Sequence, residues 1–386
     1  MRFAVVAFLF AYALSPQTTP EQQLPFSDKS WALTGERTAI VQDGGRDVLQ
    51  VETGFAHRRD VRLEDGTIEF DVQVTRRRSF VYVYFRGAAD GEREEFYLRP
   101  HKSGLPDAAQ YAPVWQNRSA WQLHHGPGGT AAVAFEPGAW TRVRVVVQGR
   151  HAALFVGDMT TPVLLVPQLA REPRAGYIAV GGFLPAGVPG DGPIAKFSNV
   201  VIRPDAVPFD FKTALSTNAE LATPAAQSQD GIVRAWSVSR SFVPRPVETA
   251  ALPPADVTRE FQRLETGPNG LLELHRHVQM PEKSNVAAAV ARIRVRAARA
   301  GTYAFDLGFS DVAIVFVNGQ PLFQGNQSYS FDRPRREGLI GFDQARLYLP
   351  LTAGDNEVAV VVSDSFGGWG LMGRLVSLEG LSIDVP

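Results

Sequence analysis

The chain has 386 residues, 45% of them hydrophobic, which is enough for two or three domains with apolar cores. Its formal net charge is −1, without a long basic or acidic run, which argues against nucleic acids and anionic membranes as partners. Cysteine is absent, which excludes disulfide bonds, thiolate nucleophiles and cysteine-ligated zinc. The 35 Gly, 27 Pro and 24 Phe favour short strands joined by turns over long helices.

The first segment predicts export. Met1-Arg2 precedes an apolar run, Phe3–Leu14, that is too short to span a bilayer. Ala11-Tyr12-Ala13 has the small-residue spacing of a cleavage site, so residues 1–15 are expected to be a signal peptide. The alternative is a buried first strand. A signal peptide implies a periplasmic or extracellular protein, and no other stretch of the sequence is long and apolar enough to cross a membrane.

Residues 26–203 predict a first domain made of strands, with the pattern of a jelly-roll sandwich. Within it, Ala39–Glu52 predicts a hairpin that turns at its Asp-Gly-Gly sequence. His101–Ser119 contains glycine and prolines and is predicted to be a long loop, a kind of segment that is often functional. Ala120–His124 is expected to continue as a strand.

Two neighbouring segments, Phe80–Arg86 and Glu95–His101, alternate with a period of two and predict an antiparallel pair of strands. One face of the pair is apolar: Val81, Val83, Phe85, Phe96 and Leu98. The other carries rings and charges: Tyr82, Tyr84, Arg86, Glu95, Tyr97, Arg99 and His101. Such a face can bind a polyhydroxylated ligand by stacking and hydrogen bonding. The alternative is a solvated outer face with weak ion pairs.

Several motifs of the first domain occur in one order: Trp31, Gly66-Thr-Ile-Glu-Phe-Asp71, Tyr84-Phe-Arg86, Trp140 with Val143-Arg-Val145, His151-Ala-Ala-Leu-Phe-Val156 and Phe197-Ser-Asn199. This order resembles the concanavalin A-like lectin and glucanase superfamily, including laminin-G-like and 3-keto-disaccharide hydrolase-like members. The resemblance implies a β-sandwich that binds ligands on its concave sheet or on the loops at its rim. It thereby implies ligand contacts from Tyr82, Tyr84, Arg86, Glu95, Tyr97 and Arg99.

Candidate catalytic groups are few. Glycoside hydrolysis requires two carboxyl groups on either side of the bond, and Glu69 and Asp71 alternate on one strand without a third acid in register. Glu95 and His101 are the candidates for acid and base chemistry, although an ion pair with Arg86 or Arg99 is the commoner role for a lone carboxylate such as Glu95. If the chain is an enzyme, glycoside hydrolysis is the expected class.

The sequence predicts no cofactor and no metal site, and leaves a single structural calcium ion open. His101, His124 and His125 are close in sequence, but adjacent histidines on a strand point in opposite directions.

Aromatic residues outside the strand pair are further candidates. Tyr111, Trp115 and Trp121 lie in or beside the predicted loop, where exposed rings can stack on sugars and buried rings anchor the loop. Trp369 lies between glycines and is expected either to stack on a ligand or to pack between the domains.

Residues 204–231 are poor in aromatics and predict a linker, and residues 232–386 predict a second sandwich. The second part contains Asp311-Val-Ala-Ile-Val-Phe-Val-Asn-Gly319, then Gly354-Asp-Asn-Glu357 and Phe366-Gly-Gly-Trp-Gly370. These motifs resemble the galactose-binding-like fold. The Asn-Gly pair in the first of them also predicts a tight hairpin.

Three functions follow from these patterns. The preferred one is an exported carbohydrate-binding protein that holds a glycan on the polar face described above. The second is a glycoside-cleaving or keto-sugar-processing enzyme that uses the same face. The third is a structural or interaction protein of the cell envelope.

Overall fold

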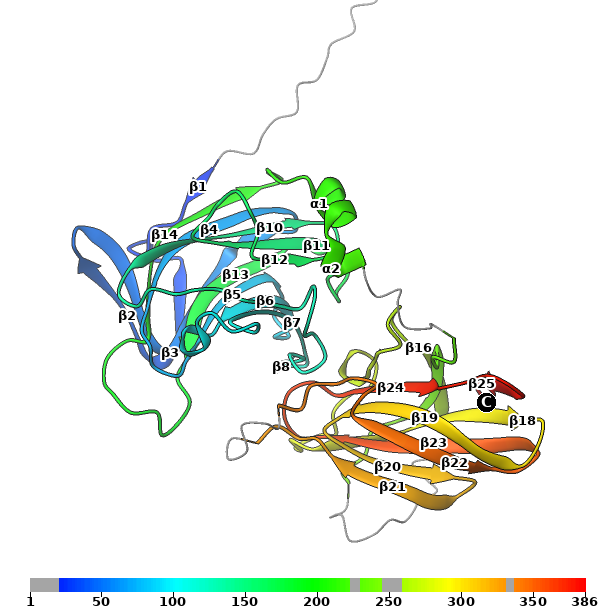
Figure 1. Ribbon diagram of the computed structural model, residues 1–386. Coiled ribbons are helices and arrows are strands. Elements are labelled where there is room, and N and C mark those ends of the chain that lie inside the picture. Colours follow the sequence, from blue (N-terminus) through cyan, green and yellow to red (C-terminus); the bar gives the residue numbers. More distant parts are fainter. Residues whose placement is uncertain (1–20, 223–229, 245–258, 331–336) are drawn as a thin grey trace, which may run out of the picture.

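The computed structural model describes residues 21–222, 230–244, 259–330 and 337–386, and these form two β-rich units (Figure 1). The strands of the first unit run from Gln22 to Pro204, and those of the second from Ala235 to Asp384. The predicted all-β class with sandwich architecture is confirmed. The predicted signal peptide lies outside the described residues and stays a prediction.

The first unit contains 14 strands in one hydrogen-bonded sheet, whose main path is β12-β11-β10-β4-β14-β3-β13-β5-β6-β7-β8. Their bounds are β1 Gln22–Gln23, β2 Trp31–Asp43, β3 Arg46–Leu63, β4 Gly66–Val74, β5 Phe80–Gly87, β6 Arg93–Leu98, β7 Ala109–Trp115, β8 Arg118–Ser119, β9 Thr130–Ala131, β10 Trp140–Gln148, β11 His151–Val156, β12 Leu164–Val166, β13 Gly176–Phe183 and β14 Ala195–Pro204. A short 3-10 turn, η1 (Pro100–Lys102), lies between β6 and β7.

This sheet curls so that its two ends face each other across one core. Val145 of β10 and Leu154 of β11 belong to the same buried cluster as Phe85 of β5 and Phe96 of β6. The alternating apolar side chains therefore fill the space between the two halves of the sheet, as in a sandwich. The predicted hairpin of β2 and β3 is confirmed, with Asp43 opposite Arg46.

The predicted antiparallel pair and its side-chain parity are also confirmed. β5 and β6 pair with Val83 opposite Phe96 and Tyr82 opposite Tyr97. Val83 and Phe96 lie in the core, whereas Tyr82 and Tyr97 lie on the face that points away from it. A period of two in the sequence thus places the rings on the face that points away from the core and the aliphatic side chains in the core.

The predicted loop His101–Ser119 is largely wrong, because residues Ala109–Trp115 form β7 and pair with β6. Pro113 tolerates this position although it has no backbone N–H to donate. The expected strand Ala120–His124 is also wrong. That segment turns, and the Gln110 side chain donates to the carbonyl oxygens of Trp121 and His124, each at 2.7 Å. The Gln110 side chain thus supplies hydrogen bonds that a partner strand would otherwise supply.

The segment predicted as a linker carries two short helices, α1 (Phe211–Thr217) and α2 (Ala219–Ala222). The side chain of Asp210 caps α1 by accepting from Thr213 N at 3.1 Å. Phe211 is buried against Phe155 of β11 and so holds α1 on the outside of the first sandwich. Among the helices of the described residues, none combines the length and the apolar character needed to cross a bilayer.

The second unit is a sandwich of a seven-stranded and a four-stranded sheet, with main paths β16-β15-β18-β23-β20-β21 and β17-β24-β19-β22. The bounds are β15 Ala235–Ser239, β16 Phe261–Glu265, β17 Leu272–Glu273, β18 Ala287–Ala297, β19 Gly301–Ser310, β20 Val312–Val317, β21 Gln320–Asn326, β22 Ala345–Leu351, β23 Gly354–Asp364, β24 Gly370–Leu375 and β25 Leu381–Asp384, with a 3-10 turn η3 at Leu274–Arg276.

Large side chains from both sheets, including Trp236, Phe305 and Trp369, meet between them and are fully buried. The hairpin predicted at Asn318-Gly319 is confirmed, since Val317 lies opposite Gln320. Asn318 has a φ of 49°, as the first central residue of a tight hairpin turn requires.

Candidate functional site

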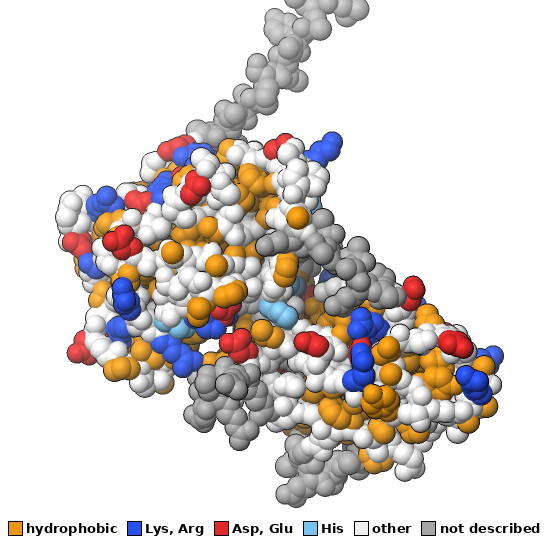
Figure 2. Space-filling view, viewed as in Figure 1, with side chains coloured by type: hydrophobic (Ala, Val, Ile, Leu, Met, Phe, Trp, Pro, Cys, Tyr) orange, Lys and Arg blue, Asp and Glu red, His pale blue; other side chains and the backbone are white. Residues whose placement is uncertain are grey.

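A cavity of about 1130 Å³ lies where the face of β5 and β6 that points away from the core meets one end of the second sandwich. Charged side chains lie on both sides of the seam between the two sandwiches, with histidine beside it (Figure 2). The first sandwich contributes to the cavity lining, among others, Arg78, Phe80, Tyr82, Tyr97, Arg99, His101, Lys102, Asp107, Gln110, Gln116, Arg118, Ser119, Trp121 and Thr130. The second contributes, among others, Tyr329, Glu337, Ser365, Phe366 and Gly367.

One row of side chains crosses four strands and forms the floor. Tyr82 lies opposite Tyr97, Tyr97 opposite Gln110, and Gln110 opposite Thr130. Opposed residues of antiparallel strands share a face, so all four line the cavity together. The ring centroids of Tyr82 and Tyr97 are 5.3 Å apart. Tyr82 is half-buried, and its hydroxyl has no hydrogen-bond partner among the described residues.

A buried hydrogen-bond network fixes this floor. Arg99 Nη2 donates to Tyr97 Oη at 2.7 Å and to Gln110 Oε1 at 2.5 Å, while Nη1 donates to Asp107 Oδ2 at 2.9 Å. Tyr97 Oη in turn donates to Gln110 Oε1 at 2.6 Å. Burial raises the pKa of Tyr97, so its phenol stays neutral. These side chains are held in place before any ligand arrives.

His101 stands at one edge of the floor, where its ring meets Phe80 edge to face at 5.6 Å. Ser79 N donates to His101 Nδ1 at 3.3 Å. Burial, with the nearby charges of Arg78 and Lys102, lowers the pKa of His101 to about 4. The ring is therefore neutral at pH 7, and because Nδ1 accepts, the proton must be on Nε2. His101 can donate a hydrogen bond through Nε2 but is not set up to accept a proton there.

The opposite wall comes from the second sandwich. Phe366 is 52% exposed, and the ring centroids of Tyr329 and Phe366 are 5.9 Å apart. Tyr329 also meets Trp121 of the first sandwich edge to face at 5.5 Å, and its hydroxyl accepts from Arg78 Nη2 at 2.8 Å. Rings from both sandwiches therefore form one continuous aromatic wall.

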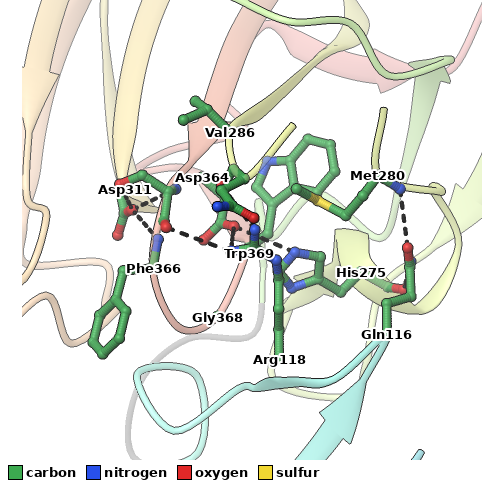
Figure 3. Close-up of polar contacts among 12 residues, drawn as sticks. Gln116, Arg118, His275, Met280, Val286, Asp311, Asp364, Phe366, Gly368 and Trp369 are labelled. Atoms are coloured by element: carbon green, nitrogen blue, oxygen red, sulfur yellow. Dashed lines mark hydrogen bonds and ion pairs between the residues drawn. The ribbon is translucent and has the colours of Figure 1, made fainter. Parts of the chain in front are cut away.

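The loop that carries Phe366 is held by Asp311 (Figure 3). Asp311 Oδ2 accepts from Ser365 N and Ser365 Oγ, each at 2.9 Å, and from Phe366 N at 3.1 Å. Burial, together with the charge of Asp364, raises the pKa of Asp311 to about 6. Turn capping is thus the role that the structure gives Asp311.

Two side chains from the end of β7 and from β8 join the sandwiches. Gln116 Nε2 donates to the carbonyl oxygens of His275 at 2.7 Å and Val278 at 3.0 Å, while Met280 N donates to Gln116 Oε1 at 2.9 Å (Figure 3). Arg118 Nη1 donates to the buried carboxylate of Asp364 at 3.1 Å. Each link satisfies buried polar groups, which fixes the wall relative to the floor.

Glycines in the loop that carries Phe366 allow the two sandwiches to approach each other closely. Gly367 has a φ of 91°, and a Cβ there would lie only 1.7 Å from Gln122 Oε1. A Cβ on Gly368 would lie 2.6 Å from Leu123 Cγ. Gly368 N donates to Gln122 Oε1 at 2.6 Å. The glycine-rich loop therefore docks on the first sandwich through its backbone.

The structure brings Tyr82, Tyr97, Arg99 and His101 to the cavity, but five other predicted site residues lie elsewhere. Trp369 is fully buried in the second core, where Nε1 donates to Val362 O at 3.1 Å. Trp115 packs between the sandwiches, with the Arg171 guanidinium 4.2 Å from its ring centroid. Neither tryptophan lines the cavity, so their proposed ligand contact is corrected.

Arg86 is corrected as well. Its backbone has a φ of 52°, beside a shift in the register between β5 and β13. The side chain is 1% exposed and donates to Glu64 O at 2.8 Å, Asp65 Oδ1 at 2.9 Å and Gly149 O at 2.6 Å. Arg86 therefore links neighbouring segments at the end of β5 that lies away from the cavity, and it does not face a ligand.

Tyr84 and Glu95 lie on the predicted face but beneath its surface. The Tyr84 ring stacks on Phe55 at 4.7 Å. Glu95 is 1% exposed, pairs with Arg93 at 3.2 Å and accepts from Ser119 Oγ at 2.7 Å. Burial raises the pKa of Glu95. Ser119 lines the cavity and Glu95 does not, so the expected catalytic role of Glu95 has no direct route to a ligand.

Sequence reasoning missed other cavity residues. Phe80 lies two residues before Tyr82, so the alternation alone places it on the same face, and it lines the cavity too. Gln110 lies in the segment that the sequence predicts to be a loop, and Trp121 lies beside that segment, where a ring can either stack on a sugar or anchor the loop. Tyr329 and Phe366 carry no local signal, since only the docking of the second sandwich makes them part of the site.

Within the part of the chain that the structure describes, no three His, Asp or Glu side chains converge as they would around a metal ion.

Comparison with known proteins gives low similarity. No family model and no curated protein matches the chain. A Bacillus subtilis protein of unknown function with a galectin-like fold shares 11% identity over 47% of this chain and 94% of its own, at a TM-score of 0.36. A Bacillus subtilis carbohydrate-binding module shares 12% identity over 45% of this chain and 95% of its own, at a TM-score of 0.33. A Bacillus licheniformis β-glucanase shares 13% identity over 49% of this chain and 99% of its own, at a TM-score of 0.35. Each solved structure resembles about half of the chain.

Proposed function

We propose that this protein is an exported carbohydrate-binding protein that holds a glycan in the cavity between its sandwiches. The second sandwich, proposed to be galactose-binding-like, supplies one wall of that site. The single observation that carries the proposal is the pairing of aromatic rings with fixed hydrogen-bonding groups around one open space of about 1130 Å³.

The rings supply the apolar half of such recognition. Sugar rings present C–H groups on one face, and these pack on aromatic side chains that stay partly exposed. Tyr82, Trp121 and Phe366 are partly or largely exposed and line the same space. Because they come from both sandwiches, a saccharide can contact rings on two sides.

The polar groups supply the other half. Tyr82 has an available hydroxyl, His101 has Nε2–H, and Lys102 and Asp107 form an ion pair at the edge of the cavity. Hydroxyl groups of a sugar both donate and accept, so they match a mixed set of donors and acceptors. The Arg99 network is satisfied internally, which keeps the floor rigid and lowers the entropy lost on binding.

The same groups favour binding over bond cleavage. Glycoside hydrolysis needs carboxyl groups on both sides of the scissile bond. Glu95 is covered and ion-paired, and His101 donates instead of accepting at Nε2. Asp107 is shared between Arg99 and Lys102.

Isothermal titration against a panel of soluble oligosaccharides tests the proposal. The wild-type chain is expected to bind at least one of them, and Tyr82→Ala to weaken that binding. Tyr348→Ala is the matched control, because Tyr348 is 62% exposed on β22 and lies away from the cavity. Equal binding by the wild type and Tyr82→Ala, or no binding to any member of a broad panel, would contradict the proposal.

A further inference from the structure

We infer that the ligand is an acidic saccharide, one whose carboxylate or sulfate groups lie against three consecutive arginines beside the cavity. This inference rests on the proposed function and adds the charge class of the ligand. It is carried by a second hollow that adjoins the first and by the balance of charges around both.

The second hollow, of about 640 Å³, is lined by Arg76, Arg77, Arg78 and the segment from Pro185 to Pro189. Arg78 and Pro185 line the large cavity too, so the two spaces share a wall. A chain of sugar units that stacks on the rings of the large cavity has a direct path past these arginines.

The three arginines lie in the connection between β4 and the floor strand β5. Arg76 is exposed. Arg77 is held in place by donating from Nη1 to Gly192 O at 2.7 Å, and the carboxylate of Glu52 lies 3.8 Å from Nη2. Arg78 reaches the second sandwich through Tyr329. One arginine is thus open to solvent, one is anchored and one borders both spaces.

The charge balance around the two spaces is positive. Among the described residues, the cationic side chains that line them are Arg76, Arg77, Arg78, Arg99, Lys102 and Arg118, and the anionic ones are Asp107 and Glu337. This gives an excess of four positive charges with the histidines taken as neutral. When Glu52, which pairs with Arg77, and Asp364, which pairs with Arg118, are added, the described residues still carry an excess of two.

This local excess stands out because the whole chain has a formal net charge of −1. Cationic side chains lining a hollow with low-dielectric walls focus the potential inside it and attract anions. Guanidinium groups also match carboxylate and sulfate oxygens through paired N–H donors. A neutral sugar would use the rings and hydroxyl partners but would gain nothing from the positive charge of these arginines.

The test compares hexasaccharides that differ in charge. Isothermal titration of the full chain would use galacturonate and chondroitin sulfate hexasaccharides as acidic probes, with cellohexaose and mannohexaose as neutral ones. At least one acidic probe is expected to bind ten-fold or more tightly than either neutral probe, and the two acidic probes separate a preference for carboxylate from one for sulfate. A single-stranded DNA hexamer is included, and tighter binding to it than to every acidic saccharide would overturn the inference.

The double variant Arg76→Gln with Arg78→Gln is expected to lose at least ten-fold in affinity for the acidic probe. The matched control is Arg263→Gln, because Arg263 is exposed on β16 away from both spaces. If the double variant folds poorly, the wild type still decides the question. Raising sodium chloride from 50 mM to 300 mM should weaken acidic binding about ten-fold or more, since exposed charges are screened.

The two proposals fail differently. Neutral binding that depends on Tyr82 and equals or exceeds acidic binding would overturn the acidic inference and leave the carbohydrate site standing. Absence of binding to every saccharide would overturn both. An acidic preference without loss in the arginine double variant, or without salt dependence, would overturn the inferred role of these arginines.

Discussion

The side chains of strand β5 alternate in the same way at both of its ends, but one end lines the cavity and the other is buried. At one end Phe80 and Tyr82 line the cavity, and at the other Arg86 is sealed into the protein. At the open end Tyr82 lies opposite Tyr97, and the second sandwich forms the facing wall of the cavity. At the closed end the register with β13 shifts and carbonyl oxygens surround the guanidinium. Alternation assigns a face, whereas the neighbouring strands decide which part of that face stays open.

The largest expected effect belongs to the closed end. Arg86→Met should lower the free energy of unfolding by about 3 kcal/mol, because it removes a buried charge and leaves two carbonyl oxygens without their donor. Urea denaturation followed by circular dichroism measures this. The exposed Arg62, replaced by Met, is the matched control and should change stability little. Loss of glycan affinity in a fully folded Arg86→Met would contradict the separation of the two ends.

The next effect belongs to the open end. Tyr82→Ala should raise the dissociation constant for the bound saccharide about 30-fold, which corresponds to about 2 kcal/mol for a central aromatic contact. The free energy of unfolding should change less, since Tyr82 is only half-buried. Titration calorimetry and urea denaturation on the same samples give both quantities. A large loss of stability without a loss of affinity would make Tyr82 resemble Arg86 and break the comparison.

A smaller effect tests whether the far wall is fixed. Gln116→Ala removes three hydrogen bonds between the sandwiches, at a cost of about 1–3 kcal/mol. The amide of Met280, which donates to Gln116 Oε1, should then exchange with solvent faster in hydrogen-exchange mass spectrometry. The Glu265 segment on the far edge of the second sandwich serves as the internal reference. Unchanged protection around Met280 would show that the wall does not depend on this link.

The smallest effect concerns His101. The pKa of His101 is lowered to about 4 in the folded protein, so the unfolded chain binds this proton more readily. The resulting stability is present above about pH 6.5 and is lost as the pH falls towards 4. Between pH 5.5 and 8 His101 stays neutral, and glycan affinity should therefore vary less than about two-fold. An affinity that follows a group with a pKa near 6.5, and that His101→Gln flattens, would contradict the neutral donor assigned here.

The sequence predicts the all-β class, the β5–β6 pair and its parity, because alternating burial is a local pattern. It does not predict β7, since glycine and proline at 104, 106 and 113 suggest a loop while pairing with β6 decides the outcome. Trp115 and Trp369 were candidates on ring type alone, and packing buries both. Tyr329 and Phe366 become site residues only when the second sandwich docks, which no local pattern encodes.

A saccharide bound by this protein should lie between the two sandwiches and touch both. A crystal structure of the full chain with a bound oligosaccharide tests it most directly. Sugar rings are expected against Tyr82 on one side and against Tyr329 or Phe366 on the other. A saccharide held on the outer surface, or by the second sandwich alone, would contradict it.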